Sequence, residues 1–252
     1  MCGRYLIIST PETIRAFFRY PEQPNFPPRY NVAPTQPVPI VRLLENERHF
    51  ALVRWGLIPA WVKDPRTFSL LINARGDSVN EKPAFRNAMK RRRCLIPADG
   101  FYEWMERGGR RWPYVVRSKD GGPIAFAGLW ESWMGPGGEE METAAIVTTQ
   151  ASRDIAHIHD RMPVIVAPDA FDFWLDCRNV DAVSAAAVIA PALPGMLDTY
   201  EISNAVNHAA NDSPALLEPF EPTVATPADP ASEADARRAR KPKKDDRQQS
   251  LF

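Results

Sequence analysis

Cysteine is scarce in this chain of 252 residues: it occurs only three times, and an odd number cannot be fully paired. A disulfide framework of the kind that stabilises secreted domains is therefore not expected, and a reducing, cytoplasmic compartment is. Long apolar runs are also missing, since none approaches the ~18 residues that cross a bilayer. The first residues do not lead into a secretory signal, so we expect no membrane partner.

The chain also lacks an excess of either charge, because 31 Lys and Arg residues balance 31 Asp and Glu residues. It therefore cannot hold nucleic acid through bulk positive charge and counterion release alone. Any such binding has to come from a local cluster, and one is present at Lys82, Arg86 and residues 90–93 (KRRR). A run of this kind is more often only a solvated helix face.

Signatures of bound metals and nucleotides are absent from the sequence. It has no Cys-x-x-Cys pair, no paired histidines at metal-ligand spacing and no glycine-rich phosphate loop. We therefore expect neither a metal nor another cofactor. Cys94 and Cys177 lie in apolar or helical contexts and are interpreted as packing residues.

Short segments rich in Val, Ile and aromatic residues recur along the chain and predict β-strands. Gly-Gly pairs at 108–109, 121–122 and 137–138 suit the turns between some of them. The predicted strands are residues 2–8, 37–43, 49–55, 112–117, 124–130, 143–148 and 162–166.

Helix signals lie between these strands. Residues 9–12 (STPE) form a capping-box pattern that opens a helix ending near Phe18, and further helices are predicted at 81–92, 151–157 and 170–177. There is no regular strand–helix alternation and no internal repeat. The predicted fold class is α+β, with a curved, mainly antiparallel, barrel-like sheet and surrounding helices in a single domain.

This domain is expected to cover residues 1–220, which contain all seven tryptophans, and the composition changes beyond Phe220. Residues 221–230 are rich in Pro and Ala, and residues 237–244 carry six basic residues among eight. Such a segment buries too little apolar surface to order itself. Residues 221–252 are therefore predicted to be a disordered basic tail.

Cys2 is the most informative single residue. Initiator methionine is normally removed before a small second residue, which leaves a free α-amine and a thiol on the same residue. The α-amine has a pKa of about 7.7–8.0, so about a quarter of it is neutral near pH 7.4, against about 0.1% of a lysine amine. Such an amine forms a Schiff base with an aldehyde, and the adjacent thiol can then close a five-membered thiazolidine ring. The competing interpretation is a buried apolar cysteine at the start of a strand.

Six segments, in this order along the chain, resemble the signatures of one protein family. They are residues 1–5 (MCGRY), 30–35 (YNVAPT), 54–59 (RWGLIP), 73–75 (NAR), 94–104 (CLIPADGFYEW) and 159–163 (HDRMP). Together they identify the chain as a member of the SRAP domain family of abasic-site processing proteins, over about residues 2–220. The resemblance implies a protein that captures the ring-opened abasic sugar of single-stranded DNA on Cys2 as a thiazolidine, and so shields the lesion during replication.

The resemblance also implies roles for individual residues. Asn73 would donate to the sugar oxygen or orient the amine, and Glu103, in an aromatic setting, would accept or position the proton of the amine. His159 would act as a general acid, since its ordinary pKa lies near 6.5. The same Schiff base would allow some β-elimination, which is a lyase activity. A cytoplasmic, nucleoid-associated bacterial protein is the implied setting.

Contacts to DNA are expected at Arg75 and Arg161, which resemble the phosphate-binding arginines of the family, and at Arg4 beside the nucleophile. Trp55, with the rest of its block and Trp61, would offer a stacking surface for unpaired bases, and Arg86 belongs to the basic cluster. One departure concerns Asp77, because the family commonly has Glu at this position. The shorter side chain leaves the role of Asp77 open.

The last five residues (QQSLF) resemble the short peptide with which bacterial replication and repair proteins bind the sliding clamp. Gln248 would set the register, and Leu251 and Phe252 would enter an apolar pocket of the clamp. The alternative is a frayed terminus.

Two other functions remain open at this point. The same free Cys2 would serve an N-terminal-nucleophile cysteine peptidase or amidohydrolase, with its α-amine as the base and Asn73 or a backbone amide stabilising the oxyanion. The third hypothesis is a non-catalytic module that binds single-stranded DNA, in which Cys2 is incidental.

Overall fold

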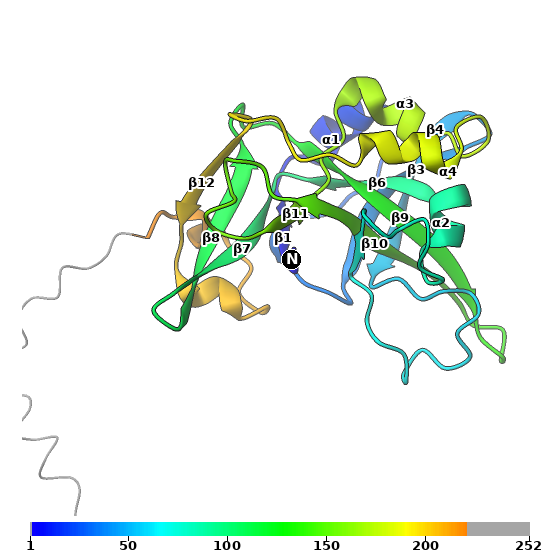
Figure 1. Ribbon diagram of the computed structural model, residues 1–252, viewed down its shortest axis with the longest axis horizontal. Coiled ribbons are helices and arrows are strands. Elements are labelled where there is room, and N and C mark those ends of the chain that lie inside the picture. Colours follow the sequence, from blue (N-terminus) through cyan, green and yellow to red (C-terminus); the bar gives the residue numbers. More distant parts are fainter. Residues whose placement is uncertain (1, 221–252) are drawn as a thin grey trace, which may run out of the picture. The chain divides into compact units, whose positions relative to one another are not determined.

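Two β-sheets make up the body of this chain, which the computed structural model describes over residues 2–220 (Figure 1). The first sheet has the strand order β12–β8–β7–β1–β2, and every neighbouring pair in it is antiparallel. Its strands are β1 (Tyr5–Ile7), β2 (Arg29–Val32), β7 (Gly100–Arg107), β8 (Arg110–Ser118) and β12 (Leu197–Glu201).

The second sheet closes on itself. Strand β9 pairs with β6 and β10, and the remaining pairings β10–β4, β4–β3 and β3–β6 complete a ring of five strands. Only the pairings of β10 with β4 and β5 are parallel. The predicted curved, mainly antiparallel, barrel-like core is confirmed. The strands of this sheet are β3 (Pro37–Leu44), β4 (Glu47–Trp55), β5 (Asn73–Arg75), β6 (Arg93–Ala98), β9 (Ile124–Met134), β10 (Glu140–Gln150) and β11 (Arg161–Pro163).

Strand β1 is buried on both faces. Tyr5 packs edge-to-face against Trp55 at 5.4 Å and against Phe126 at 6.0 Å, within the main core that the barrel encloses. Leu6 points the other way, into a smaller apolar cluster with Tyr102 and Val115. Because successive side chains of a strand alternate between its faces, β1 joins the barrel to the rest of the protein. The residue that precedes it is therefore held from two sides.

The helices are short and lie outside the sheets (Figure 1). They are α1 (Pro11–Phe18), α2 (Arg86–Arg91), α3 (Phe171–Leu175) and α4 (Ala182–Ala185), and 3₁₀ segments are Pro168–Ala170, Ala186–Val188, Asn204–Asn207 and Pro214–Leu217. Helix α1 ends at Phe18 as predicted, and Thr10 caps it by accepting the Thr13 N–H at 3.2 Å. Among residues 2–220, no helix has the length and apolarity that a membrane crossing requires.

Two helix predictions need correction. Residues 151–157 form turns and no helix, because they belong to the connection between Gln150 and Arg161, which are partners in the antiparallel pairing of β10 with β11. The predicted helix at 81–92 shrinks to α2. Pro83 disfavours helical geometry at the residue before it, so the helix begins only at Arg86.

The basic run at 90–93 is also not one solvated face. Lys90 and Arg91 are exposed, but Arg92 forms an ion pair with Glu131 and lies over the Trp130 ring. Arg93, the first residue of β6, is 1% exposed. Its guanidinium donates hydrogen bonds of 2.6–2.8 Å to four carbonyl oxygens, those of Met89, Trp174, Asp176 and Val180. The predicted tail and its residues Gln248, Leu251 and Phe252 lie outside the described residues.

Replacing Arg93 tests this structural role. Arg93→Met fills similar space but leaves four carbonyl oxygens without their donor, so we expect the free energy of unfolding to fall by about 2–4 kcal/mol. Urea denaturation followed by circular dichroism measures the change. The exposed neighbour provides the control: Arg91→Met should change stability by no more than about 0.5 kcal/mol. Equal effects of the two substitutions would contradict the assignment.

Candidate functional site

Cys2 lies three residues before the start of β1 and is fully buried. The Tyr102 N–H donates to the Arg4 carbonyl at 3.0 Å, which continues the β1–β7 register beyond the pair Tyr5↔Phe101. Glu103 lies two residues after Phe101 in β7. The antiparallel register therefore brings the residues preceding β1 alongside Glu103.

Asn73 contacts Cys2 from the second sheet. It is the first residue of β5, which is held parallel to β10 by the pairing Asn73↔Ile146. Its Nδ2 donates to the Cys2 carbonyl at 2.8 Å. Its Oδ1 is buried and accepts no hydrogen bond within residues 2–220. Asn73 thus holds Cys2 with one end of its amide and offers an acceptor with the other.

Glu103 is a carboxyl in an apolar environment, with the residue only 2% exposed. Burial raises its pKa to about 7. Burial, and then the charge of Glu103, raise the pKa of the Cys2 thiol well above its ordinary value. At neutral pH the sulfur is therefore a protonated thiol, and Glu103 is close to the midpoint of its own titration. A group in that state can both take and return a proton.

His159 follows the turns after β10, two residues before Arg161, and its side chain is 26% exposed. The Arg161 N–H donates to its Nδ1 at 3.0 Å, so in the neutral ring the proton resides on Nε2. Burial lowers the pKa of His159. Asp160 Oδ1, 2.9 Å from the same Nδ1, favours the charged ring, but that carboxylate is 86% exposed and well hydrated. The neutral ring with an Nε2–H donor is the form that the geometry favours.

Two charged groups connect Glu103 with His159. After burial, which dominates both shifts, Asp160 acts to raise the pKa of each group, whereas Arg111 acts to lower it. Glu103 and His159 therefore lie in a common electrostatic environment with Cys2. Arg111, an exposed residue of β8, was not identified from the sequence. The sequence feature that could have identified it is the group of basic residues around Gly108–Gly109. That segment was interpreted only as a turn.

The predicted phosphate-binding arginines differ in accessibility. Arg75 is exposed at the end of β5. Arg161 is 9% exposed, and its Nη2 donates to the Thr148 carbonyl at 2.7 Å. Its Nη1 contacts Asp77 Oδ2 at 3.2 Å. The shorter carboxylate of Asp77 thus still reaches Arg161, which gives this residue a structural role that the sequence left open.

Arg4 is engaged by the protein. Its terminal nitrogens donate to Asn31 Oδ1 at 2.9 Å and to the carbonyls of Val206 and Asn207 at 2.8 and 3.2 Å. These bonds fix the segment Asn204–Asn207 beside β1. The expected phosphate contact of Arg4 stays a prediction, and its guanidinium already has three protein acceptors.

The stacking role expected for Trp55 is wrong. Trp55 is completely buried and its indole N–H donates to the Ile72 carbonyl at 3.0 Å, so no base can reach the ring. Trp61, by contrast, is 60% exposed and lies edge-to-face against Phe68. Arg86 is exposed on α2, and the interactions that connect the other site residues do not include it.

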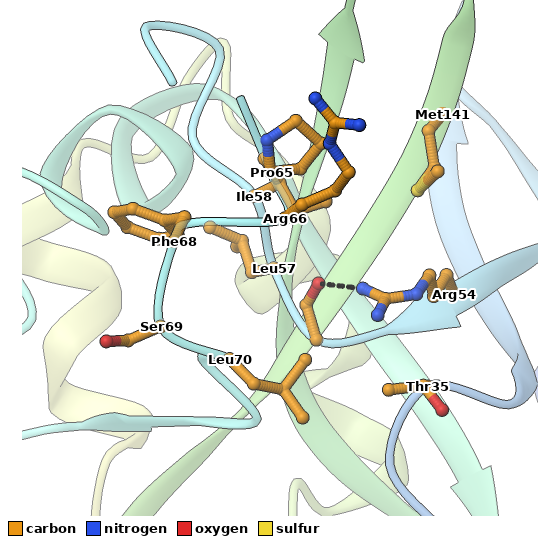
Figure 2. A pocket seen from close by; sticks show the side chains of 11 residues that line it. Thr35, Arg54, Leu57, Ile58, Pro65, Arg66, Phe68, Ser69, Leu70 and Met141 are labelled. Atoms are coloured by element: carbon orange, nitrogen blue, oxygen red, sulfur yellow. Dashed lines mark hydrogen bonds between the residues drawn. The ribbon is translucent and has the colours of Figure 1, made fainter. Parts of the chain in front are cut away.

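A pocket of about 410 Å³ is lined by Phe68, the residue whose ring Trp61 contacts (Figure 2). Leu57, Phe68, Leu70 and Met141 give it apolar walls, and Arg54, whose Nη1 donates to the Gly56 carbonyl at 3.4 Å, adds a cation. Leu57 and Leu71 form a β-bridge just before β5. The pocket is therefore attached to the segment that carries Asn73 and Arg75.

The family of the chain follows from a direct comparison. The family model for the SOS response associated peptidase (SRAP) matches residues 1–209. This chain belongs to the SRAP family. The match covers every residue of the cluster formed by Cys2, Asn73, Glu103 and His159.

Relatives and solved structures of SRAP-like architecture agree with this. The abasic site processing protein YoqW of Bacillus subtilis is 36% identical over 86% of this chain and 99% of its own length. The abasic site processing protein HMCES of Gallus gallus is 32% identical over 78% of this chain and 68% of its own length. A crystal structure of a Bacteroides thetaiotaomicron protein superposes with a TM-score of 0.77 at 26% identity, over 87% of this chain and the whole of the other.

Burying an ionisable carboxyl at the site should cost stability in a pH-dependent way. The pKa of Glu103 rises from 4.5 to about 7 on folding, so the native state holds its proton more tightly than the unfolded state. Stability therefore falls as the pH rises from 4.5 to 7, by about 3 kcal/mol in total. We expect Glu103→Gln to be more stable than wild type by up to that amount at pH 8, and by little at pH 4.5.

Chemical denaturation at the two pH values measures this difference. The control is Glu106→Gln, on the exposed end of the same strand, which should show no such pH-dependent gain. A Glu103→Gln protein that gains nothing at pH 8 would refute the raised pKa.

Proposed function

We propose that this SRAP protein processes abasic sites by forming a covalent thiazolidine between Cys2 and the ring-opened sugar in single-stranded DNA. The observation that carries the proposal is the placement of Cys2 between Asn73 of one sheet and Glu103 of the other. The names of the relatives, which describe them as abasic site processing proteins, support the same substrate.

The chemistry begins with removal of Met1, which exposes the α-amine of Cys2. The amine nitrogen attacks the C1′ aldehyde of the open sugar, and loss of one water from the carbinolamine gives an imine. The Cys2 sulfur then adds to the imine carbon, and the proton released by the thiol is balanced by one taken up at nitrogen. Amine, thiol and aldehyde thus yield a thiazolidine and one water, without redox chemistry.

The neighbouring residues fit these proton transfers. Because the buried Cys2 thiol is protonated, the amine reacts first and the thiol needs a base when the ring closes. Glu103, with its pKa near 7, takes a proton and later returns it. His159 presents its Nε2–H as an acid for opening the sugar ring or for loss of water. Asn73 Oδ1 accepts a hydrogen bond from the new amine and keeps its nitrogen pointed at the substrate.

The accessible groups around the site suit a single strand of DNA. Arg75 provides a guanidinium for a backbone phosphate, and Arg161 can share its Nη1 edge between Asp77 and a phosphate. Trp61 and the pocket that Phe68 lines offer an apolar surface to an unpaired base. The same imine would permit a slow β-elimination, which is the lyase activity. A nucleoid-associated, cytoplasmic location follows from this substrate.

A denaturing gel with an abasic-site oligonucleotide tests the proposal. Wild type should give a covalent band that disappears with Cys2→Ala and with an uncleavable N-terminal tag. Cys2→Ser keeps the amine but cannot close a sulfur ring, so its band should survive only after borohydride reduction. No covalent band for wild type would refute the crosslinking function.

The same set of variants separates the two other hypotheses. A peptidase or amidohydrolase that uses Cys2 would hydrolyse its substrate without a stable DNA adduct. A non-catalytic module would retain single-stranded DNA equally well with Cys2→Ala. Under either of these two hypotheses, wild type would give no covalent protein–DNA band on the denaturing gel.

We further propose that the C-terminal residues Gln248, Leu251 and Phe252 bind the replication sliding clamp, which would bring the site to replicating DNA. Deleting residues 248–252 should abolish clamp binding in a pull-down assay and leave crosslinking to abasic DNA unchanged. The matched control replaces the basic residues of 237–244 by alanine and retains the terminal peptide. Clamp binding that survives the deletion would end this proposal.

A further inference from the structure

The β7–β8 hairpin carries an unexplained group of cations beside the site. Its two-residue turn, Gly108–Gly109, has φ angles of +60° and +70°, the left-handed geometry of the type I′ turns that close tight hairpins. A Cβ built at either glycine would meet nothing within 4 Å, so the turn projects into solvent. Arg107, Arg110 and Arg111 surround it, and we call these three residues the arginine hairpin.

The arginines of this hairpin are not used by the fold in the same way. Arg107 lies over the Trp112 ring at 4.8 Å and is 3.5 Å from Glu201. Arg110 and Arg111 are both exposed, and neither makes an ion pair or a side-chain hydrogen bond within the described part of the chain. Glu106, opposite Arg111 in the register, and Glu201, beside Arg107, offset two of the three charges. The arginine hairpin therefore keeps a positive charge with no structural use.

Its position relative to the catalytic cluster is defined by the two sheets. Strand β8 pairs with β7, which carries Glu103 in the first sheet, whereas Arg75 follows Asn73 on β5 in the second. Cys2 is held between these strands. In Figure 1 the β7–β8 hairpin lies on one side of β1, and β10, the partner of β5, lies on the other. The strands that carry Arg111 and Arg75 thus belong to different sheets.

We propose that the arginine hairpin, through Arg110 and Arg111, binds the DNA backbone on the side of the abasic nucleotide opposite to the side that Arg75 binds. The inference rests on the proposed function and deepens it, because it assigns the second half of the DNA path. A strand that crosses the site has phosphates on both sides of the trapped sugar. One exposed guanidinium on each side would hold it taut across Cys2.

Binding at this hairpin would also reach the chemistry. Arg111 acts to lower the pKa of Glu103 and that of His159. A phosphate paired with Arg111 would offset that positive charge, so both pKa values would rise when DNA is bound. Glu103 would then retain its proton more readily, in the state that returns a proton to the substrate.

The test compares Arg110→Ala/Arg111→Ala with wild type in the initial rate of crosslinking at sub-saturating abasic oligonucleotide. We expect a reduction of about tenfold. We also expect the plot of log rate against log salt to become shallower by about 1.4, which is 0.7 for each lost phosphate contact to a single strand. The control is Arg19→Ala/Arg178→Ala, which removes two exposed arginines that line two other pockets, and it should leave both quantities unchanged.

Two truncated substrates give the decisive comparison, one with nucleotides only 5′ of the abasic site and one with nucleotides only 3′ of it. The Arg110→Ala/Arg111→Ala defect should persist on one substrate and vanish on the other, and the Arg75→Ala defect should show the reverse pattern. Loss of both defects on the same substrate would overturn the inference, and so would a double variant that captures DNA like the control. Failure of wild type to crosslink at all would instead refute the proposed function.

Discussion

The position of Cys2 depends on two hydrogen bonds that come from different sheets. The Tyr102 N–H fixes the Arg4 carbonyl to β7, and the Asn73 amide fixes the Cys2 carbonyl to β5. The first residues of a chain are ordinarily the most mobile, since they have few contacts. Here the second residue, Cys2, is fully buried and held at its backbone carbonyl, and neither hydrogen bond engages its nitrogen or its sulfur.

This arrangement lowers the free energy of unfolding. It places a carboxyl, a thiol and an amide oxygen in surroundings that exclude water, and burial shifts the pKa of the first two away from their ordinary values. The same burial gives Glu103 a pKa near neutrality and makes the electrostatic effect of nearby charges stronger than it would be in water. Favourable packing elsewhere in the fold must offset this destabilisation. The closed barrel and the aromatic contacts of Tyr5 with Trp55 and Phe126 are one source of it.

The sequence predicted which residues form the cluster better than it predicted the contacts of single residues. Cys2 could be identified from covalent structure alone, because only an N-terminal cysteine carries an α-amine and a thiol on one residue. The six motifs and their order along the chain located Asn73, Glu103 and His159. Burial depends on the tertiary partners of each residue, which no local pattern contains. Trp55 and Arg93 were therefore assigned to a surface although they are fully buried, and the bonds of Arg4 to Asn31 and Val206 were not foreseen. The strands were found where alternation was clear, but β5 has three residues and is defined only by its pairing with β10.

The motif at residues 30–35 supports the site structurally but contributes no residue to the cluster of Cys2, Asn73, Glu103 and His159. Asn31 is completely buried, and its Nδ2 lies within 2.8–3.2 Å of the carbonyls of Val206, His208 and Asn211. Asp212 accepts the N–H groups of Tyr30 and Asn31, so the bonds run in both directions between β2 and residues 206–212.

Arg4 joins the same network through Asn31 Oδ1, and Trp104, the residue after Glu103, donates to Asn207 Oδ1 at 2.8 Å. The segment near residue 207 is thereby tied to both strands that position the cluster, β1 through Arg4 and β7 through Trp104. A change at Asn31 would release this segment and disturb Cys2 and Glu103 together, although Asn31 itself has no group that takes part in the reaction. The motif is thus explained by the positions of Cys2 and Glu103, and the polar side chain of Asn31 by the carbonyls whose hydrogen bonds it must supply.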